Sequence, residues 1–191
     1  MSCKKIFWLE DNPDFFSWFR WLAQDIGVEF DLSELLSRIT FAYDFQSGKE
    51  IVAANQFDLY VLDGDFPHRL SDQRKATIDA CVENIRTTGA AVLPSDSVAQ
   101  DAVVYNNFVR FYKECLSGRQ GVVVFSMSYD AIRPSCDLRL PFYFKRGDDP
   151  EGVVSWLKRS GHLYADEPEI DGGEYGSKKE LLERYLLEQE N

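Results

Sequence analysis

Five short apolar runs recur along the chain, and they constrain its fold more than any other feature. The runs cover residues 5–9, 38–42, 57–62, 121–125 and 141–144. Apolar residues mostly follow one another in them, without the polar alternation of a strand that faces water on one side. This pattern is typical of strands buried on both faces of a parallel sheet. A sheet of this kind needs a layer of helices on each side.

Helical patterns fill the intervals between these runs. Asn12 and Pro13 favour a helix start, and apolar side chains recur at helical spacing over residues 13–24. Further helices are predicted over residues 47–54, about 102–117 and 149–161. The alternation of strands and helices indicates a doubly wound α/β fold with a five-stranded parallel sheet.

Two regions do not fit a minimal version of this fold. Residues 68–101 lie between the third strand and the next helix, and they contain an apolar pattern at helical spacing. The residues of that pattern are Ile78, Cys81, Val82 and Ile85. Residues 162–191 form an acidic extension with a capping-box pattern at Ser177 and a helix predicted at about 178–190. We therefore expect one domain over residues 1–161 with a helical insertion, followed by a C-terminal extension.

Charge and cysteine content narrow the class of protein. The formal net charge is −11, from 32 acidic and 21 basic residues, which argues against binding nucleic acid or an anionic membrane. The four cysteines, Cys3, Cys81, Cys115 and Cys136, show no metal-binding spacing, and we interpret them mostly as packing residues. The sequence opens without a signal-peptide pattern and has no apolar stretch of membrane-spanning length, so we expect a cytoplasmic protein.

Residues that can carry chemistry follow four of the five apolar runs. Glu10 and Asp11 follow the first run, Asp63 the third, Ser126 the fourth and Lys145 the fifth. In open α/β sheets, ligands bind beyond the carboxyl ends of the strands. Random surface charges would fall on helices and loops just as often, so this placement predicts a ligand site at one edge of the sheet.

The residue types at these ends suit Mg²⁺-dependent phosphoryl transfer. Three carboxylates brought together repel one another, and a cation among them offsets their charge. Mg²⁺ prefers oxygen ligands and commonly uses one or two carboxylates together with a phosphate. One carboxylate can then attack phosphorus while a lysine and a hydroxyl hold the oxygens of the phosphoryl group.

The residues around these ends resemble the receiver domain of response regulators. Residues 5–12 are similar to its first strand and acidic pair, and residues 47–67 to its second helix, third strand and phospho-acceptor loop. The resemblance covers roughly residues 4–67 and 102–161. By analogy it implies a flavodoxin-like sheet with strand order 2-1-3-4-5.

The resemblance implies a role for each carboxylate. Asp63 is then the phospho-acceptor. Asp11 holds Mg²⁺ together with Asp63 and the backbone carbonyl of Asp65, and Glu10 acts partly through water. Mg²⁺ is the cofactor that this set of ligands implies.

The later strand ends receive roles from the same resemblance. Ser126 and Lys145 contact the phosphoryl group, and Ser126 and Phe142 are the switch residues that respond to it. Two positions depart from the family pattern. Met127 stands where a small residue is usual, which narrows access to the phosphorylation site, and Arg146 stands where proline is usual.

Each of these residues also has a plain structural explanation. Asp63 with Gly64 is a turn signal, and Glu10 and Asp11 are able to cap the first helix. Ser126 could be an ordinary residue at a strand end, and Lys145 an ordinary surface lysine. Phe142 could simply belong to the core. The sequence alone leaves these explanations open beside the functional ones.

Three functions follow from these patterns. The first is a stand-alone receiver, not an enzyme, that is phosphorylated by a histidine kinase or phosphotransfer protein and acts through contact with an unknown downstream protein. The second is a degenerate receiver that serves as an unphosphorylated binding module. The third is a phosphatase similar to the haloacid dehalogenase family, whose paired aspartates resemble Asp63-Gly64-Asp65. Many receivers form homodimers, and the oligomeric state stays open as well.

Overall fold

The computed structural model of the chain describes residues 4–12, 19, 27, 31–88, 107–145 and 175–187. The helices predicted over residues 13–24 and 149–161 lie outside these residues, apart from Phe19. Cys3, Arg146 and residues 89–101 of the insertion also lie outside them. Within the described part of the chain, no helix combines the length and the apolarity that crossing a membrane requires.

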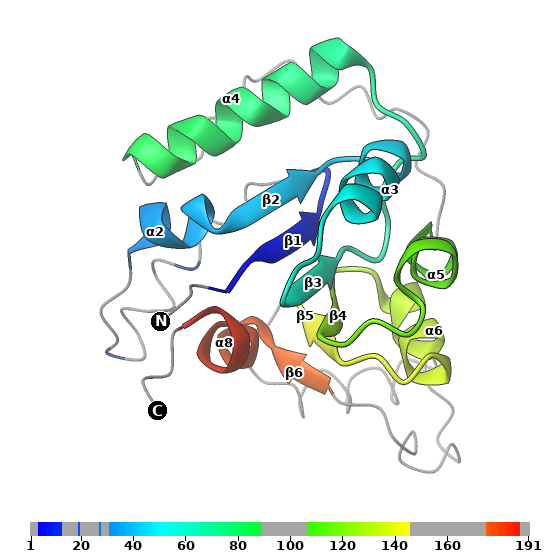
Figure 1. Cartoon of the computed structure of the whole chain (residues 1–191). Coiled ribbons are helices and arrows are strands. Elements are labelled where there is room, and N and C mark those ends of the chain that lie inside the picture. The colour runs from blue at the N-terminus through cyan, green and yellow to red at the C-terminus, as the bar shows by residue number, and fades with distance from the viewer. Residues whose placement is uncertain are drawn as a thin grey trace.

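The described strands form one sheet in which every neighbouring pair is parallel (Figure 1). The strands are β1 (Ile6–Leu9), β2 (Ile39–Ala42), β3 (Leu59–Leu62), β4 (Val122–Ser126), β5 (Phe142–Phe144) and β6 (Tyr175–Ser177). Their order is β2-β1-β3-β4-β5-β6. The doubly wound α/β fold and the flavodoxin-like order of the first five strands are therefore confirmed.

The sheet has one strand more than the sequence predicts. β6 pairs with β5, and Gly176 lies opposite Tyr143 in the register. A Cβ atom on Gly176 would lie 2.3 Å from Cε1 of Tyr143, so only glycine leaves room for the tyrosine ring at this position of β6. A three-residue strand with glycine at its centre has almost no strand signal in the sequence, which explains why β6 reads as a loop.

Helices separate the strands along the chain. The described ones are α2 (Leu32–Ser37), α3 (Phe45–Ala54), α4 (Asp72–Thr88), α5 (Asn107–Phe111), which continues as the π-helical turn η2 (Tyr112–Leu116), the 3-10 turn η3 (Tyr129–Ala131), α6 (Ile132–Asp137), and α8 (Lys178–Leu181), which continues as the π-helical turn η4 (Leu182–Leu186). The predicted insertion helix is α4, and all four of its predicted apolar residues are buried. The predicted C-terminal helix is α8 with η4, and the capping box at Ser177 is present.

Successive residues of each central strand are buried on opposite faces of the sheet. In β1, Ile6 and Trp8 belong to one apolar cluster, and Phe7 and Leu9 belong to the other. Burying a large apolar side chain contributes about 1.5–3 kcal/mol, so both faces stabilise the sheet. This arrangement is the physical reason for the continuous apolar runs in the sequence.

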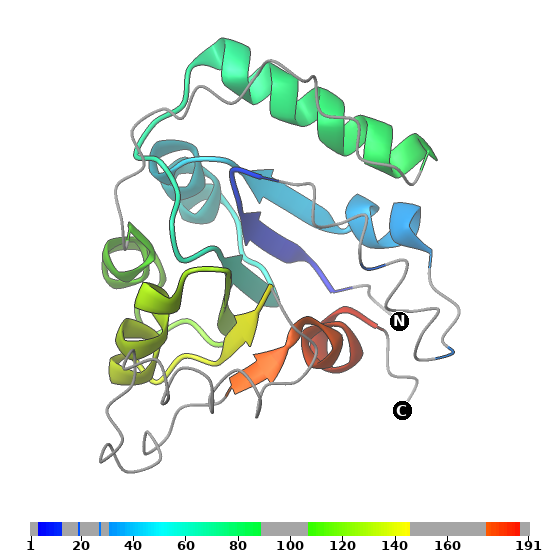
Figure 2. The ribbon, with the colours of Figure 1, turned by 180° about the vertical axis from the view of Figure 1, so that it is seen from behind.

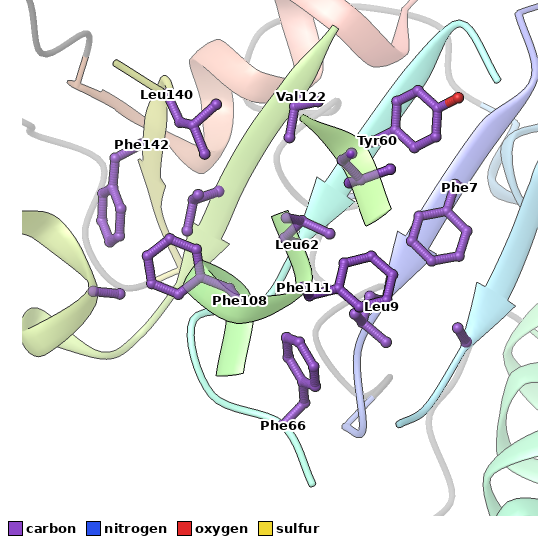
Figure 3. Packing of buried hydrophobic residues seen from close by; sticks show 14 of the residues in the cluster. Phe7, Leu9, Tyr60, Leu62, Phe66, Phe108, Phe111, Val122, Leu140 and Phe142 are labelled. Carbon is purple, nitrogen blue, oxygen red and sulfur yellow. The ribbon is translucent and has the colours of Figure 1, made fainter. Parts of the chain in front are cut away.

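Different helices cover the two faces. Apolar residues of α2, α4, α8 and η4 join the cluster of Trp8, and residues of α3, α5 and α6 join the cluster of Phe7. Figure 3 shows the second cluster, in which Phe108 and Phe111 of α5 lie over Leu62 of β3. Figures 1 and 2 show that α4 runs alongside β2 at one end of the sheet, whereas β6 forms the opposite end.

Candidate functional site

The ladder of backbone hydrogen bonds continues past the ends of the strands and fixes the residues that follow. The amide of Glu10 donates to the Ala42 carbonyl at 2.9 Å, and the amide of Asp63 donates to the Leu9 carbonyl at 2.9 Å. Beyond β5, the Lys145 amide donates to the carbonyl of Ser126 at 3.1 Å. The parallel sheet therefore brings the predicted residues to one edge, as the sequence indicates.

Three of these residues form a compact acidic cluster. Carboxylate oxygens of Glu10, Asp11 and Asp63 lie within 4.8 Å of one another. Glu10 and Asp63 are buried, and Asp11 is partly buried. Among the described residues this is the only group of three acidic or metal-binding side chains that could hold a metal ion.

Lys145 lies between two members of the acidic cluster. Its Nζ atom is 3.0 Å from Oδ2 of Asp63 and forms a close ion pair with Oε2 of Glu10. The other oxygens are also engaged: Oε1 of Glu10 accepts from the Asn12 amide at 3.1 Å, and Oδ1 of Asp63 accepts from the Gly64 amide at 2.7 Å. These bonds hold both carboxylates in fixed orientations at the edge of the sheet.

The protonation behaviour of the cluster shows that its negative charge is not fully compensated. Burial and the Asp63 carboxylate raise the pKa of Glu10 well above its ordinary value, and the same two causes raise the pKa of Asp11 to about 6. Burial disfavours the charged form of Lys145, but the carboxylates of Asp63 and Glu10 outweigh it and raise the pKa of this lysine. One ammonium group is therefore insufficient for three carboxylates in this environment.

A cation fits this donor set. When ionised, the three carboxylates and Lys145 carry a combined charge of −2, which one divalent ion neutralises. Oxygen ligands of this kind are those that hard ions such as Mg²⁺ prefer. Glu10, Asp11 and Asp63 are the side chains that could hold such an ion. The predicted contribution of the Asp65 carbonyl stays a prediction.

Ser126 lies at the same edge, against the loop that follows Asp63. It is buried, and its hydroxyl accepts a hydrogen bond from the Ser128 amide at 3.0 Å. A Cβ atom on Gly64 would lie 2.6 Å from the Ser126 hydroxyl and 2.7 Å from the Cβ of Ala131. The loop after Asp63 therefore contacts the end of β4 directly, and only glycine fits at this position.

Phe142 and Met127 occupy contrasting environments. Phe142 is buried in the cluster of Phe7 and meets the Phe144 ring edge-on at a centroid distance of 4.8 Å. Its predicted switch role stays a prediction beside this core position. Met127 directly follows Ser126 and, at 43% exposure, is the one exposed large apolar side chain among the described residues.

One residue at this edge was not identified from the sequence. Asp44 lies two residues beyond β2, is fully buried, and begins α3 as its N-cap. Burial alone would raise its pKa, but hydrogen bonds from Lys75, Ser47 and Leu70 hold the pKa below its ordinary value. The signal for the cap was present, since Asp44 lies three residues before Ser47, where the predicted helix begins.

Comparison with known proteins adds no family assignment. No family model matches this sequence, and no curated protein matches it. What the structure establishes is a flavodoxin-like, all-parallel α/β sheet with a buried acidic cluster at its carboxyl edge, an arrangement consistent with a receiver-like fold.

Proposed function

We propose that this chain is a receiver-type signalling protein that accepts a phosphoryl group on Asp63 in a Mg²⁺-dependent reaction. The observation that carries the proposal is the acidic cluster itself, with the Lys145 ammonium 3.0 Å from Oδ2 of Asp63. A purely structural ion pair needs one carboxylate for one lysine, whereas this cluster leaves charge for a cation and a nucleophile for phosphorus.

The residues divide the chemistry among themselves. In the proposed step, a carboxylate oxygen of Asp63 forms a bond to phosphorus while the bond between phosphorus and the donor's leaving atom breaks, and the leaving group keeps the electron pair. A bound Mg²⁺ supplies charge neutralisation for the acidic cluster and the phosphoryl oxygens. Lys145 is placed to stabilise negative charge beside Asp63, and Ser126 offers a hydroxyl next to Gly64, the residue that follows Asp63.

The donor and the partners are those that the resemblance to receiver domains implies. A histidine kinase or a phosphotransfer protein would supply the phosphoryl group, and an unknown downstream protein would recognise the modified form. The net charge of −11 supports output through protein contact rather than nucleic acid or a membrane. The receiver-type role also implies a cytoplasmic switch rather than an enzyme.

Incubation with a small phosphoryl donor tests the proposal directly. The intact protein with Mg²⁺ should gain the mass of one phosphoryl group, stable in acid and labile in base, and chelation of Mg²⁺ should abolish the gain. Asp63→Asn should remain unmodified. Asp58→Asn is the matched control, because Asp58 lies just before the opposite end of the same strand and its carboxylate accepts from the Lys5 amide there.

The same experiment separates the competing functions. Repeated release of phosphate from a generic phosphate ester, abolished by Asp63→Asn, would favour the phosphatase. A wild-type protein that gains no mass, and whose Trp8 fluorescence does not respond to Mg²⁺, would favour the unphosphorylated binding module. Trp8 is a suitable reporter because it lies in β1, two residues before Glu10.

A further inference from the structure

The loop that follows Asp63 leads directly into α4, the helix of the insertion. Residues 64–70, which we call the acceptor loop, connect the end of β3 to Ser71 and the first turn of α4. Leu70, the last residue of this loop, is buried and packs in one apolar cluster with Ile78 and Val82 of α4. The end of the loop and one face of the helix therefore form a single packed unit.

One carboxylate oxygen joins the two parts of this unit. Oδ2 of Asp44 accepts a hydrogen bond from the Leu70 amide at 2.7 Å and lies 2.9 Å from Nζ of Lys75, in the first turn of α4. Oδ1 of the same residue accepts from the amide and the hydroxyl of Ser47, at 2.7 Å and 2.6 Å. Because Asp44 is shielded from water, these contacts are strong. We call Asp44, Leu70 and Lys75 the latch.

The acceptor loop is also held along its length. Backbone amides of the first turn of α3 donate to the carbonyls of Pro67 and His68 at 3.0 Å and 3.2 Å. The side-chain amide of Asn107, in α5, donates to the carbonyl of Phe66 at 2.6 Å. These bonds tie the acceptor loop to α3 and α5, so a shift of the loop would also involve Asp44, the N-cap of α3.

Packing restricts the direction of such a displacement. On the side of β4 and η3, Gly64 lies so close to Ser126 and Ala131 that even a methyl group would overlap with them. A phosphoryl group and a cation added at Asp63 cannot push the loop that way. The opposite direction, across β1 toward β2, leads to the latch, since Asp44 follows β2 and α4 runs alongside that strand (Figure 1).

We propose that α4 reports the chemical state of Asp63, and that the latch transmits that state to the helix. This inference rests on the proposed function and names the element whose structure responds to the modification. It also gives a role to the insertion, which contributes no residue to the acidic cluster. α4 suits this role because its buried residues occupy one face, and that face packs against Leu70 at the end of the acceptor loop.

Hydrogen–deuterium exchange on the intact chain tests the inference, with Mg²⁺ and beryllium fluoride as the mimic of the phosphoryl group. In the wild-type protein, the mimic should change amide exchange over residues 72–80 by about fivefold or more, the lower range of typical coupling between sites. Lys75→Met should remove most of this change, and Lys75→Arg should restore it. Residues 178–186, in α8 and η4, provide an internal reference that should not respond.

Lys49→Met is the matched control, because Lys49 is an exposed lysine whose Nζ lies 3.7 Å from a carboxylate oxygen of Glu114, outside the latch. It should leave the response of α4 intact. Binding of the mimic is measured separately through Trp8 fluorescence. If the mimic binds while exchange in α4 stays constant, or if Lys75→Met responds like wild type, the inference is wrong although the proposed function stands. Failure of the mimic to bind contradicts both.

Discussion

The carboxyl edge of the sheet holds two buried aspartates in opposite circumstances. Asp44, beyond β2, meets a full set of hydrogen-bond donors. Its donors are the Ser47 amide and hydroxyl, the Leu70 amide and the Lys75 ammonium. Asp63, beyond β3, accepts from the Gly64 amide and shares the ammonium of Lys145 with Glu10. Both aspartates follow a strand at the carboxyl edge of the sheet. They differ in how far the neighbouring donors and cations compensate the negative charge around them.

The difference separates a carboxylate that stabilises the fold from the carboxylates to which we assign the proposed function. At the latch, the donors overcome the effect of burial and lower the pKa of Asp44, so its ionised form stabilises the fold. In the acidic cluster, burial and mutual repulsion raise the pKa of Glu10 and of Asp11, so their ionised forms destabilise it. A bound cation would supply the compensation that the protein itself does not provide here, which is why the proposed function places Mg²⁺ at this cluster.

Removal of the shared ammonium should have the largest effect on this balance. Lys145→Met leaves Glu10 and Asp63 buried without the cation that contacts them both, and loss of one member of a buried ion pair costs about 3 kcal/mol. Urea unfolding in the presence of a chelator should show this loss. Mg²⁺ at millimolar concentration should restore part of it, because ion binding stabilises the folded state.

Lys49→Met provides the reference for this prediction. The exposed pair between Lys49 and Glu114 should contribute about 0.5 kcal/mol or less. If Lys145→Met lost no more stability than this control, or if Mg²⁺ did not restore any of it, the cluster would not be the uncompensated site described above.

The latch should give the next largest effect, without any rescue by metal. Asp44→Asn keeps a side chain that can cap α3, but it removes the charged partner of Lys75 and should cost about 2 kcal/mol. Asp31→Asn is the matched control at the exposed N-cap of α2, where asparagine caps as well as aspartate. Its effect should be about 0.5 kcal/mol or less. A Mg²⁺-dependent recovery of Asp44→Asn would contradict the separation of the two sites.

The features predictable from the sequence are those that repeat locally. Continuous apolar runs indicate a sheet buried on both faces, and strand ends locate Asp63 and Lys145 at one edge without knowledge of any contact. The spacing of Ile78, Cys81, Val82 and Ile85 identifies the buried face of α4 for the same reason. The spacing of apolar residues and the position directly after a strand suffice for these features, because the segment around each residue places it.

The features missed by the sequence depend on distant or weak signals. Lys145 meets Glu10 across 135 residues, and Leu70 meets Asp44 across 26, so neither pairing has a local pattern. β6 was missed because Gly176 is a poor strand former and is required only by the Tyr143 ring of the neighbouring strand. Whether a buried aspartate is structural or functional is decided by such contacts, not by its place after a strand.

Neutralising one member of the acidic cluster should have the smallest effect and the opposite sign. Asp11→Asn removes a partly buried charge whose pKa is raised to about 6, so the metal-free protein should gain about 1–2 kcal/mol at pH 7.5. Urea unfolding in a chelator measures this gain. In millimolar Mg²⁺ the order should reverse, because the wild-type protein gains binding energy that the variant has lost. A destabilised metal-free variant would mean that the carboxylate of Asp11 has a structural role like that of Asp44.

The dependence on pH provides an independent check on the sign of this effect. Because the folded protein raises the pKa of Asp11 to about 6, the proton is bound more tightly in the folded state. The contribution of this group to stability is therefore fully present below its unfolded pKa of about 4 and is lost as the pH rises through about 6. Asparagine does not titrate, so the stability advantage of Asp11→Asn should grow by about 0.5–1 kcal/mol per pH unit across this window and then level off. An advantage that stayed constant from pH 4 to pH 7, measured in a chelator, would mean that the folded protein leaves the affinity of Asp11 for its proton unchanged.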